Sequence, residues 1–118
     1  MLVVNRFVVE GDDAEFRARA GTALAALAGR RGYLRGQLGR AYDDRTRWTL
    51  VTEWESVGAY RRALSAYEVK VDATPLLAES LDEPSAFEVL AQAAPGGAVR
   101  TAPSDLAASG DRAGEAVP

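Results

Sequence analysis

The chemistry open to this sequence is limited by two absent residue types. Its 118 residues contain no histidine and no cysteine, which excludes thiol nucleophiles, Ser-His-Asp triads, His-ligated haem and zinc sites with Cys or His ligands. No group of acidic residues has the spacing of a metal-binding loop, so no metal is predicted. Catalysis must therefore rely on Asn, Tyr, Trp, Arg, Lys, Asp or Glu, or on the reactivity of the substrate.

Asn5 is the most informative polar residue, because it interrupts the otherwise apolar and β-branched segment Leu2–Val9. A buried amide needs hydrogen-bond partners. Asn5 therefore either meets a partner inside the fold or faces a ligand, and both interpretations stay open.

Three segments have the composition and alternation of strands: Leu2–Val9, Tyr33–Ala41 and Arg47–Trp54. The second segment alternates weakly and places Leu34, Gly36 and Leu38 on one side. The third has one face made of Trp48, Leu50, Thr52 and Trp54. The short turn between the second and third segments predicts a β-hairpin.

Helices are predicted over about 13–28, 56–64 and 65–73, with a restart at Thr74-Pro75. Ser56 is expected to cap the second helix, and Ser65 with Glu68 to open the third. A last strand is expected over 86–90. The order predicts an α+β domain of the ferredoxin-like βαββαβ class, with a four-stranded antiparallel sheet and helices on one face.

Composition favours one soluble cytoplasmic domain at residues 1–92, followed by a disordered tail at 93–118 that is rich in Ala, Gly, Pro and Ser. No apolar run approaches the ~18–20 residues that span a membrane. A net charge of −3 with mixed signs argues against nucleic acid as a partner.

The face of the sheet without helices is expected to carry Leu2, Val4, Val8 and Val51 among polar residues. An open face with so many branched apolar groups would be an unusually large exposed patch. A second copy of the same sheet would cover it, which predicts a homodimer.

The stretch Val51-Thr-Glu-Trp-Glu-Ser-Val-Gly-Ala-Tyr60 resembles the signature of the antibiotic-biosynthesis-monooxygenase superfamily, where a strand ends in Trp-Glu-Ser and the next helix opens with an Ala-aromatic pair. Gly32-Tyr-Leu34, Pro75-Leu-Leu-Ala78 and Glu83-Pro-Ser-Ala-Phe-Glu-Val89 also fit, so the resemblance covers about residues 1–91. It implies a dimeric α+β barrel with a pocket between the sheet and helices of each subunit.

Some members of that superfamily oxidise polyketide anthrones or quinols with dioxygen and no metal or organic cofactor. The resemblance places Trp54 and Tyr60 at pocket positions of that branch, whose asparagine four residues before the tryptophan is Leu50 here. An indole N–H and a phenol O–H in an apolar cavity could orient a polycyclic phenol or stabilise an enolate or peroxide. The alternative is that both are ordinary core aromatics.

Other members bind and degrade haem, and Asn5 resembles the first-strand asparagine of that branch. Its second tryptophan corresponds to Ala63, and its axial histidine has no counterpart. Tyr67 or Lys70 would have to replace that ligand, so haem degradation is disfavoured.

The favoured hypothesis is a cofactor-independent monooxygenase that uses dioxygen to oxidise an electron-rich aromatic such as a phenol, anthrone or quinol. Asn5, Trp54 and Tyr60 are the predicted catalytic residues. The predicted pocket residues are Phe7, Trp48, Leu50 and Tyr67. The alternative is a non-catalytic small-molecule-binding or stress-related dimer on the same scaffold, and a haem-binding protein ranks third.

Overall fold

The computed structural model describes residues 1–104, which divide into a unit Met1–Phe87 and a second unit that begins at Glu88. The first unit contains, in chain order, β1 (Leu2–Val8), α1 (Ala14–Ala28), β2 (Tyr33–Arg40), β3 (Arg47–Trp54), α2 (Val57–Leu64), α3 (Tyr67–Asp72), α4 (Thr74–Leu77) and β4 (Ala86–Phe87). This order confirms the predicted ferredoxin-like class. The last strand is shorter than the predicted 86–90.

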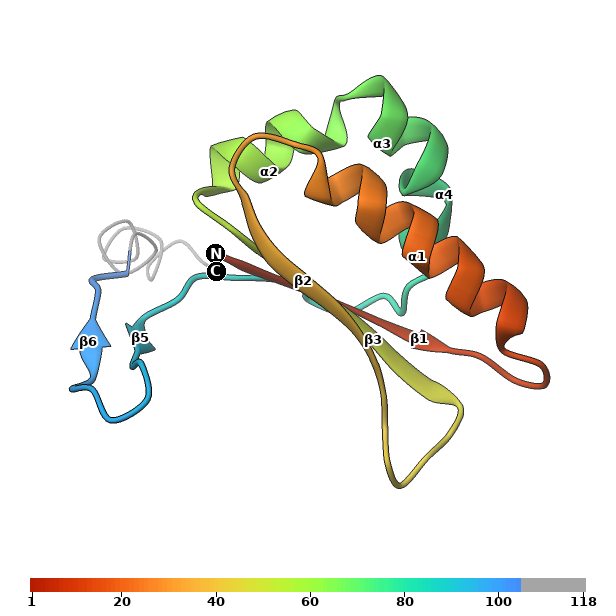
Figure 1. Cartoon of the computed structure of the whole chain (residues 1–118), viewed down its shortest axis with the longest axis horizontal. Coiled ribbons are helices and arrows are strands. Elements are labelled where there is room, and N and C mark those ends of the chain that lie inside the picture. The colour runs from red at the N-terminus through yellow and green to blue at the C-terminus, as the bar shows by residue number, and fades with distance from the viewer. Residues whose placement is uncertain (105–118) are drawn as a thin grey trace, which may run out of the picture. The chain divides into compact units, whose positions relative to one another are not determined.

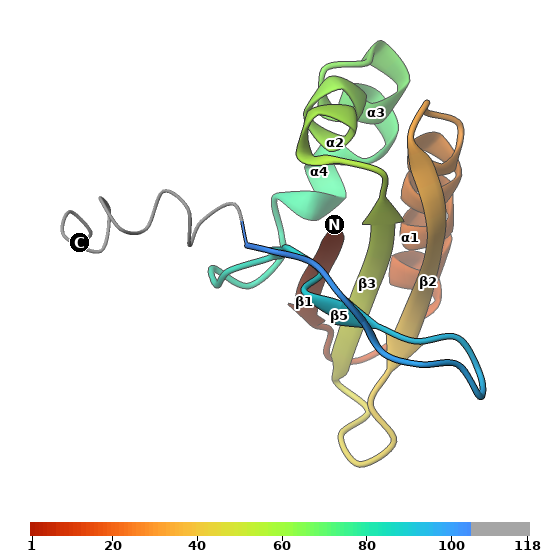
Figure 2. The ribbon, with the colours of Figure 1, turned by 90° about the vertical axis from the view of Figure 1, so that its left-hand side faces the viewer.

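The first unit is built on an antiparallel sheet with strand order β2-β3-β1-β4. All four helices lie on the same side of this sheet (Figure 1), and β3 lies between β1 and β2 (Figure 2). In the pairing of β1 with β3, Asn5 lies opposite Leu50. The long hairpin of β2 and β3 therefore brings the predicted aromatic face of β3 to the middle of the sheet.

The alternation of β3 is confirmed: Trp48, Leu50, Thr52 and Trp54 are all buried against the helices. The expectation for β2 is wrong at its first two residues. Leu34 is 46% exposed, because the register shifts between Tyr33 and Arg35, and Tyr33, which the alternation places on the other face, takes the position opposite Trp54. Such an irregularity turns every earlier side chain to the other face of a strand.

Small residues let α1 approach the core closely. Ala20 and Ala23 are fully buried, and they lie between Phe16 and Leu27 on the inner side of the helix. This stripe follows the helical period of three and four residues. It confirms the helix predicted over about 13–28, and Leu24 packs against the core while remaining partly exposed.

Ser56 caps α2, as predicted: its Oγ accepts a hydrogen bond from the backbone N–H of Ala59 at 3.0 Å. The cap predicted at Ser65 is wrong. The hydroxyl of Ser65 donates instead to the carbonyl of Arg62 at 2.7 Å, at the end of α2, and α3 begins after Ala66 with no side-chain cap.

The Ser56→Ala substitution is expected to lower the free energy of unfolding by about 1 kcal/mol, because it leaves an N–H of the first turn without an acceptor. Ser65→Ala is the matched control, with an expected change below about 0.5 kcal/mol, as for most surface substitutions. Urea unfolding measures both, and equal losses in the two variants would contradict the assignment of the cap.

The second unit contains a short antiparallel pair, β5 (Ala91–Gln92) with β6 (Arg100–Thr101). The sequence predicts disorder over 93–118. Residues 100–101 lie in that range and form strand β6. Residues 105–118 of the predicted tail lie outside the described residues.

Candidate functional site

Three rows of side chains cross the inner face of the sheet, each with one residue from β2, β3 and β1. The rows are Gly36–Thr52–Val3, Leu38–Leu50–Asn5 and Arg40–Trp48–Phe7. Neighbouring rows are two residues apart, which is about 7 Å along a strand. Tyr33 and Trp54 form a further row at the end of the sheet next to α2.

Trp54 is the centre of an aromatic cluster at that end, which we call the Trp54 cluster. Its ring centroid lies 5.4 Å from those of Tyr33 and Tyr60, and its side chain is 1% exposed. The indole N–H donates to the hydroxyl of Thr52 at 2.8 Å. This bond occupies the only hydrogen-bond donor of the indole. The N–H of Trp54 is therefore not available to a ligand, and only its ring can contact one.

Two glycines allow the Trp54 cluster to pack. Gly32 has a φ of +93°, and a Cβ there would lie 2.4 Å from the Cβ of Ala59, so its lack of a side chain lets α2 approach the start of β2. A Cβ on Gly36 would lie 2.6 Å from the hydroxyl of Tyr33. That phenol can therefore lie across the sheet above Gly36 only because no side chain is present.

Tyr60 belongs to the Trp54 cluster and also lines a groove between α2 and the helices α3 and α4. Burial raises the pKa of its phenol above the ordinary value, so the group stays protonated at neutral pH. Within the described residues its hydroxyl has no hydrogen-bond partner. The groove has a volume of about 580 Å³ and is lined by Tyr60, Leu64, Lys70, Thr74, Leu77 and Ala78.

Asn5 lies in the middle row, between Leu50 and the edge of the sheet that β4 occupies. Its side chain is only 9% exposed, and no hydrogen bond to it is present among residues 1–104. The indole nitrogen of Trp48 is the only side-chain polar atom of the described residues that is fully buried without a partner, so the amide of Asn5 keeps some accessible surface. That surface is where a ligand could meet the amide.

Phe7, Phe16 and Trp48 form a second aromatic cluster at the other end of the sheet, with edge contacts at 5.2 and 5.4 Å. The guanidinium of Arg40 lies 4.9 Å from the centroid of the Trp48 ring and is held by Asp13 at 2.9 Å. The indole nitrogen of Trp48 is buried without a partner among the described residues.

The structure brings only some of the predicted site residues together. Trp54 and Tyr60 are in contact, but Asn5 lies four residues from the level of Trp54 along the sheet, about 13 Å. Phe7, Trp48 and Leu50 are packed in the core. Tyr67 is 77% exposed and does not line the groove beside Tyr60.

The sequence points to Tyr60 as a site residue and to Lys70 only as a possible haem ligand, and it does not point to the other four residues that line the groove. Four of the six lining residues, at positions 70, 74, 77 and 78, follow the helical spacing of four, seven and eight residues. That periodicity was the available signal. It was obscured because the helix is interrupted at Ala73, between α3 and α4, with Pro75 in the first turn of α4.

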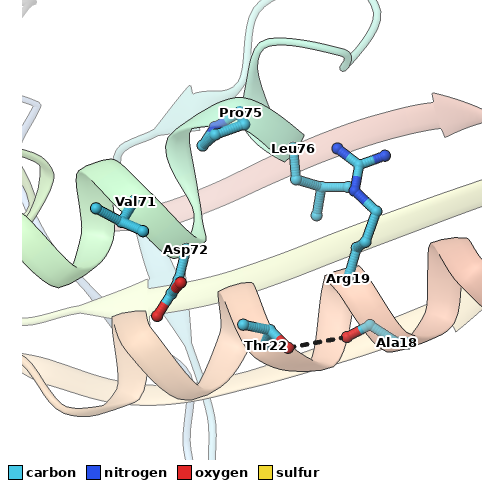
Figure 3. Close-up of a pocket in the computed structure, with 7 residues that line it drawn as sticks. All are labelled: Ala18, Arg19, Thr22, Val71, Asp72, Pro75 and Leu76. Atoms are coloured by element: carbon cyan, nitrogen blue, oxygen red, sulfur yellow. Dashed lines mark hydrogen bonds between the residues drawn. The ribbon is translucent and has the colours of Figure 1, made fainter.

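A second groove, of about 290 Å³, lies between α1 and the helices α3 and α4 and has polar edges (Figure 3). Arg19 lines it and forms a two-pronged ion pair with Glu79, at 3.2 and 2.6 Å. The hydrogen bond from Arg19 lowers the pKa of the Glu79 carboxyl. The charge of Arg19 is thus already paired, and Asp72 is the other charged residue that lines this groove.

Residues 1–104 contain neither a metal-binding cluster nor a membrane-spanning helix. No group of three or more acidic side chains could hold a metal ion there. No helix among those residues is both long and apolar enough to cross a membrane.

Comparison with solved structures identifies proteins similar to this chain. SnoaB, a cofactor-independent oxygenase from Streptomyces nogalater, is 33% identical, with a TM-score of 0.61 over 75% of this chain and 94% of that one. A variant of SnoaB is 34% identical, with a TM-score of 0.60 over 68% and 82%. A conserved protein from Methanosarcina mazei Go1, 20% identical, shares the fold with a TM-score of 0.59 over 72% and 84%.

Among curated proteins, none matches the chain. The family model described as antibiotic biosynthesis monooxygenase matches residues 1–71. That range extends from β1 into α3, and it includes Asn5, Trp54 and Tyr60. With more than half of its length matched by that model, the chain belongs to the antibiotic biosynthesis monooxygenase family.

Proposed function

We propose that this chain is a cofactor-independent monooxygenase of an electron-rich aromatic such as a phenol, anthrone or quinol. The observation that carries the proposal is the groove beside Tyr60, where a protonated phenol without a partner borders mostly apolar side chains. Its volume of about 580 Å³ lies within the usual range of ligand pockets, about 300–1,000 Å³. Similarity to a cofactor-independent oxygenase supports the same assignment.

The reaction balances without an added reductant. An anthrone first loses a proton to the solvent from its methylene carbon, which is the carbon that will be oxidised, and the resulting anion transfers one electron to dioxygen. Recombination of the radical with superoxide forms a C–O bond and, after protonation, a hydroperoxide. Loss of water from this intermediate leaves a carbonyl, so one oxygen atom enters the product and the other leaves as water.

In this proposal the protein supplies hydrogen bonds and the apolar surface of the groove. Tyr60 would donate to the phenolate or enolate oxygen, while the Trp54 ring supports it from behind. Asn5 would meet oxygen-derived anions from the sheet. Asn5 does not line the groove beside Tyr60, and about 13 Å separates its level in the sheet from that of Trp54. The role of Asn5 is therefore proposed separately from that of Tyr60 and has a test of its own.

The Tyr60→Phe substitution is expected to lower kcat/KM for the anthrone dithranol about tenfold, because one hydrogen bond to a charged oxygen is lost. The loss should be the same from about pH 6 to pH 9, since a phenol whose pKa is raised above about 10 stays protonated there. Oxygen consumption, corrected for autoxidation, measures the rate.

Tyr67→Phe is the matched control, because Tyr67 is exposed and does not line the groove. Its kcat/KM should stay within twofold of that of the unmodified protein, since surface substitutions usually change free energies by less than about 0.5 kcal/mol. The unmodified protein should consume one dioxygen per anthrone and release no hydrogen peroxide. Peroxide release, or no rate above autoxidation with a panel of anthrones and quinols, would rule out the monooxygenase.

We also propose a homodimer formed by the outer face of the sheet. Leu2, Val4 and Val51 are partly exposed there, and Val8 is 40% exposed. The charges of this face are paired within the chain, as in Arg35 with Glu53 and Arg6 with Glu83 at 2.9 Å. Paired charges are easier to cover than free ones, and sedimentation velocity would detect the dimer.

A small-molecule-binding protein without catalysis is the second candidate. It is favoured by the packing of Phe7, Trp48 and Leu50 in the core and by the occupied indole N–H of Trp54. Binding of anthraquinones without any consumption of oxygen by their anthrones would support it.

A further inference from the structure

Lys70 is the only lysine of the whole sequence, in which the other thirteen basic residues are arginines. It lies on α3, and its side chain lines the groove beside Tyr60. The other lining residues are apolar or hydroxyl-bearing, so at neutral pH Lys70 brings the only full charge into the lining.

The ammonium of Lys70 has no acidic partner among residues 1–104. Residues one helical turn away are Ala66, Tyr67, Ala73 and Thr74, none of which is acidic. Several arginines of the described chain differ in this respect, since each forms an ion pair with an acid: Arg6, Arg19, Arg30, Arg35, Arg40 and Arg47. All three N–H donors of Lys70 therefore remain available to a ligand.

Given the proposed function, we infer that the substrate is an aromatic acid whose carboxylate binds Lys70. Tyr60 and Lys70 are a neutral donor and a cation on the lining of the same groove, and Leu64 and Leu77 supply apolar surface for a ring system. A phenolic oxygen at Tyr60 and a carboxylate at Lys70 would fix the orientation of that ring. Lys70 thus determines which aromatic binds and takes no part in the bond changes.

Binding of two anthraquinones tests this inference. Rhein differs from danthron by one carboxylate, so the ratio of their dissociation constants reports on that group alone. Quenching of tryptophan fluorescence measures both. We expect rhein to bind about fivefold more tightly than danthron, near the upper end for a partly exposed ion pair, and the preference to fall at high salt.

Lys70→Met removes the charge and should abolish the preference for rhein, while the affinity for danthron stays within twofold of that of the unmodified protein. Lys70→Arg keeps the charge and should keep the preference for rhein. Arg17→Met, an exposed cation on α1 outside the groove, is the matched control and should change neither constant. Circular dichroism should show all variants folded.

The outcome for Lys70 is separable from the outcome for the monooxygenase. A preference for rhein that disappears in Lys70→Met supports the inference even if no anthrone is oxidised. Equal affinities in the unmodified protein, an unchanged preference in Lys70→Met, or no binding of either dye would overturn it, even if dithranol is oxidised at the expected rate.

Discussion

The Trp54→Ala substitution is expected to lower the free energy of unfolding by about 4 kcal/mol, the largest effect we predict for a single residue. Trp54 is 1% exposed and contacts both Tyr33 and Tyr60, so its removal leaves a large cavity at the end of the sheet. It also leaves the hydroxyl of Thr52 without the indole N–H. Urea unfolding followed by circular dichroism measures the loss.

Trp54→Phe separates packing from hydrogen bonding, because it keeps an aromatic ring in the cluster. We expect it to lose about 1–2 kcal/mol, and Thr52→Val combined with it should cost less than the sum of the single changes, because both remove the same bond. Tyr67→Ala is the surface control, with an expected loss below about 0.5 kcal/mol. Replacing a buried tryptophan by alanine usually costs about 3–5 kcal/mol of unfolding free energy, so a loss below about 1 kcal/mol in Trp54→Ala would mean that Trp54 is not a core residue.

The Asn5→Val substitution is expected to lower kcat/KM for dithranol about a hundredfold and to raise the free energy of unfolding by about 1 kcal/mol. The activity falls because an amide that stabilises an oxygen anion is lost, an effect of roughly two orders of magnitude. The stability rises because valine has a higher strand propensity than asparagine and position 5 lies in β1 with its side chain only 9% exposed. Oxygen consumption and urea unfolding measure the two effects.

The opposite signs of these two effects are the test. If Asn5 is structural, removing its amide should lower stability and activity together. Leu38→Val is the matched control in the same row of the sheet, and it should lose about 1 kcal/mol of stability while keeping its activity within threefold. Stability lost in Asn5→Val, or activity retained, would remove Asn5 from the proposed site.

Much of the fold could be predicted because its signals are local. The alternation from Trp48 to Trp54 and the apolar stripe from Phe16 to Leu27 each reflect one element packing against one core. Leu34 is the exception, since its exposure depends on a shift in the pairing of β2 with β3. Nothing in the composition of β2 alone indicates where that shift falls.

The candidate site was less predictable, because it depends on how separate elements meet. Tyr60 and Trp54 were expected together and are in contact. Tyr67 was expected in the pocket and is exposed, while Lys70, three residues later, lines the groove. The chain changes direction at Ala73, between α3 and α4, and the residue types of this segment do not indicate in which direction it turns.

The sequence by itself determined the order of the elements, the inner face of β3 and the family, because periodicity and the stretch around Trp54 are properties of consecutive residues. Only the tertiary structure decided that the indole of Trp54 is occupied by Thr52, that Asn5 has no partner within the described residues and that Lys70 borders the groove. Hydrogen bonds and cavities form between residues that are distant in the chain, so their geometry exists only once the elements have packed.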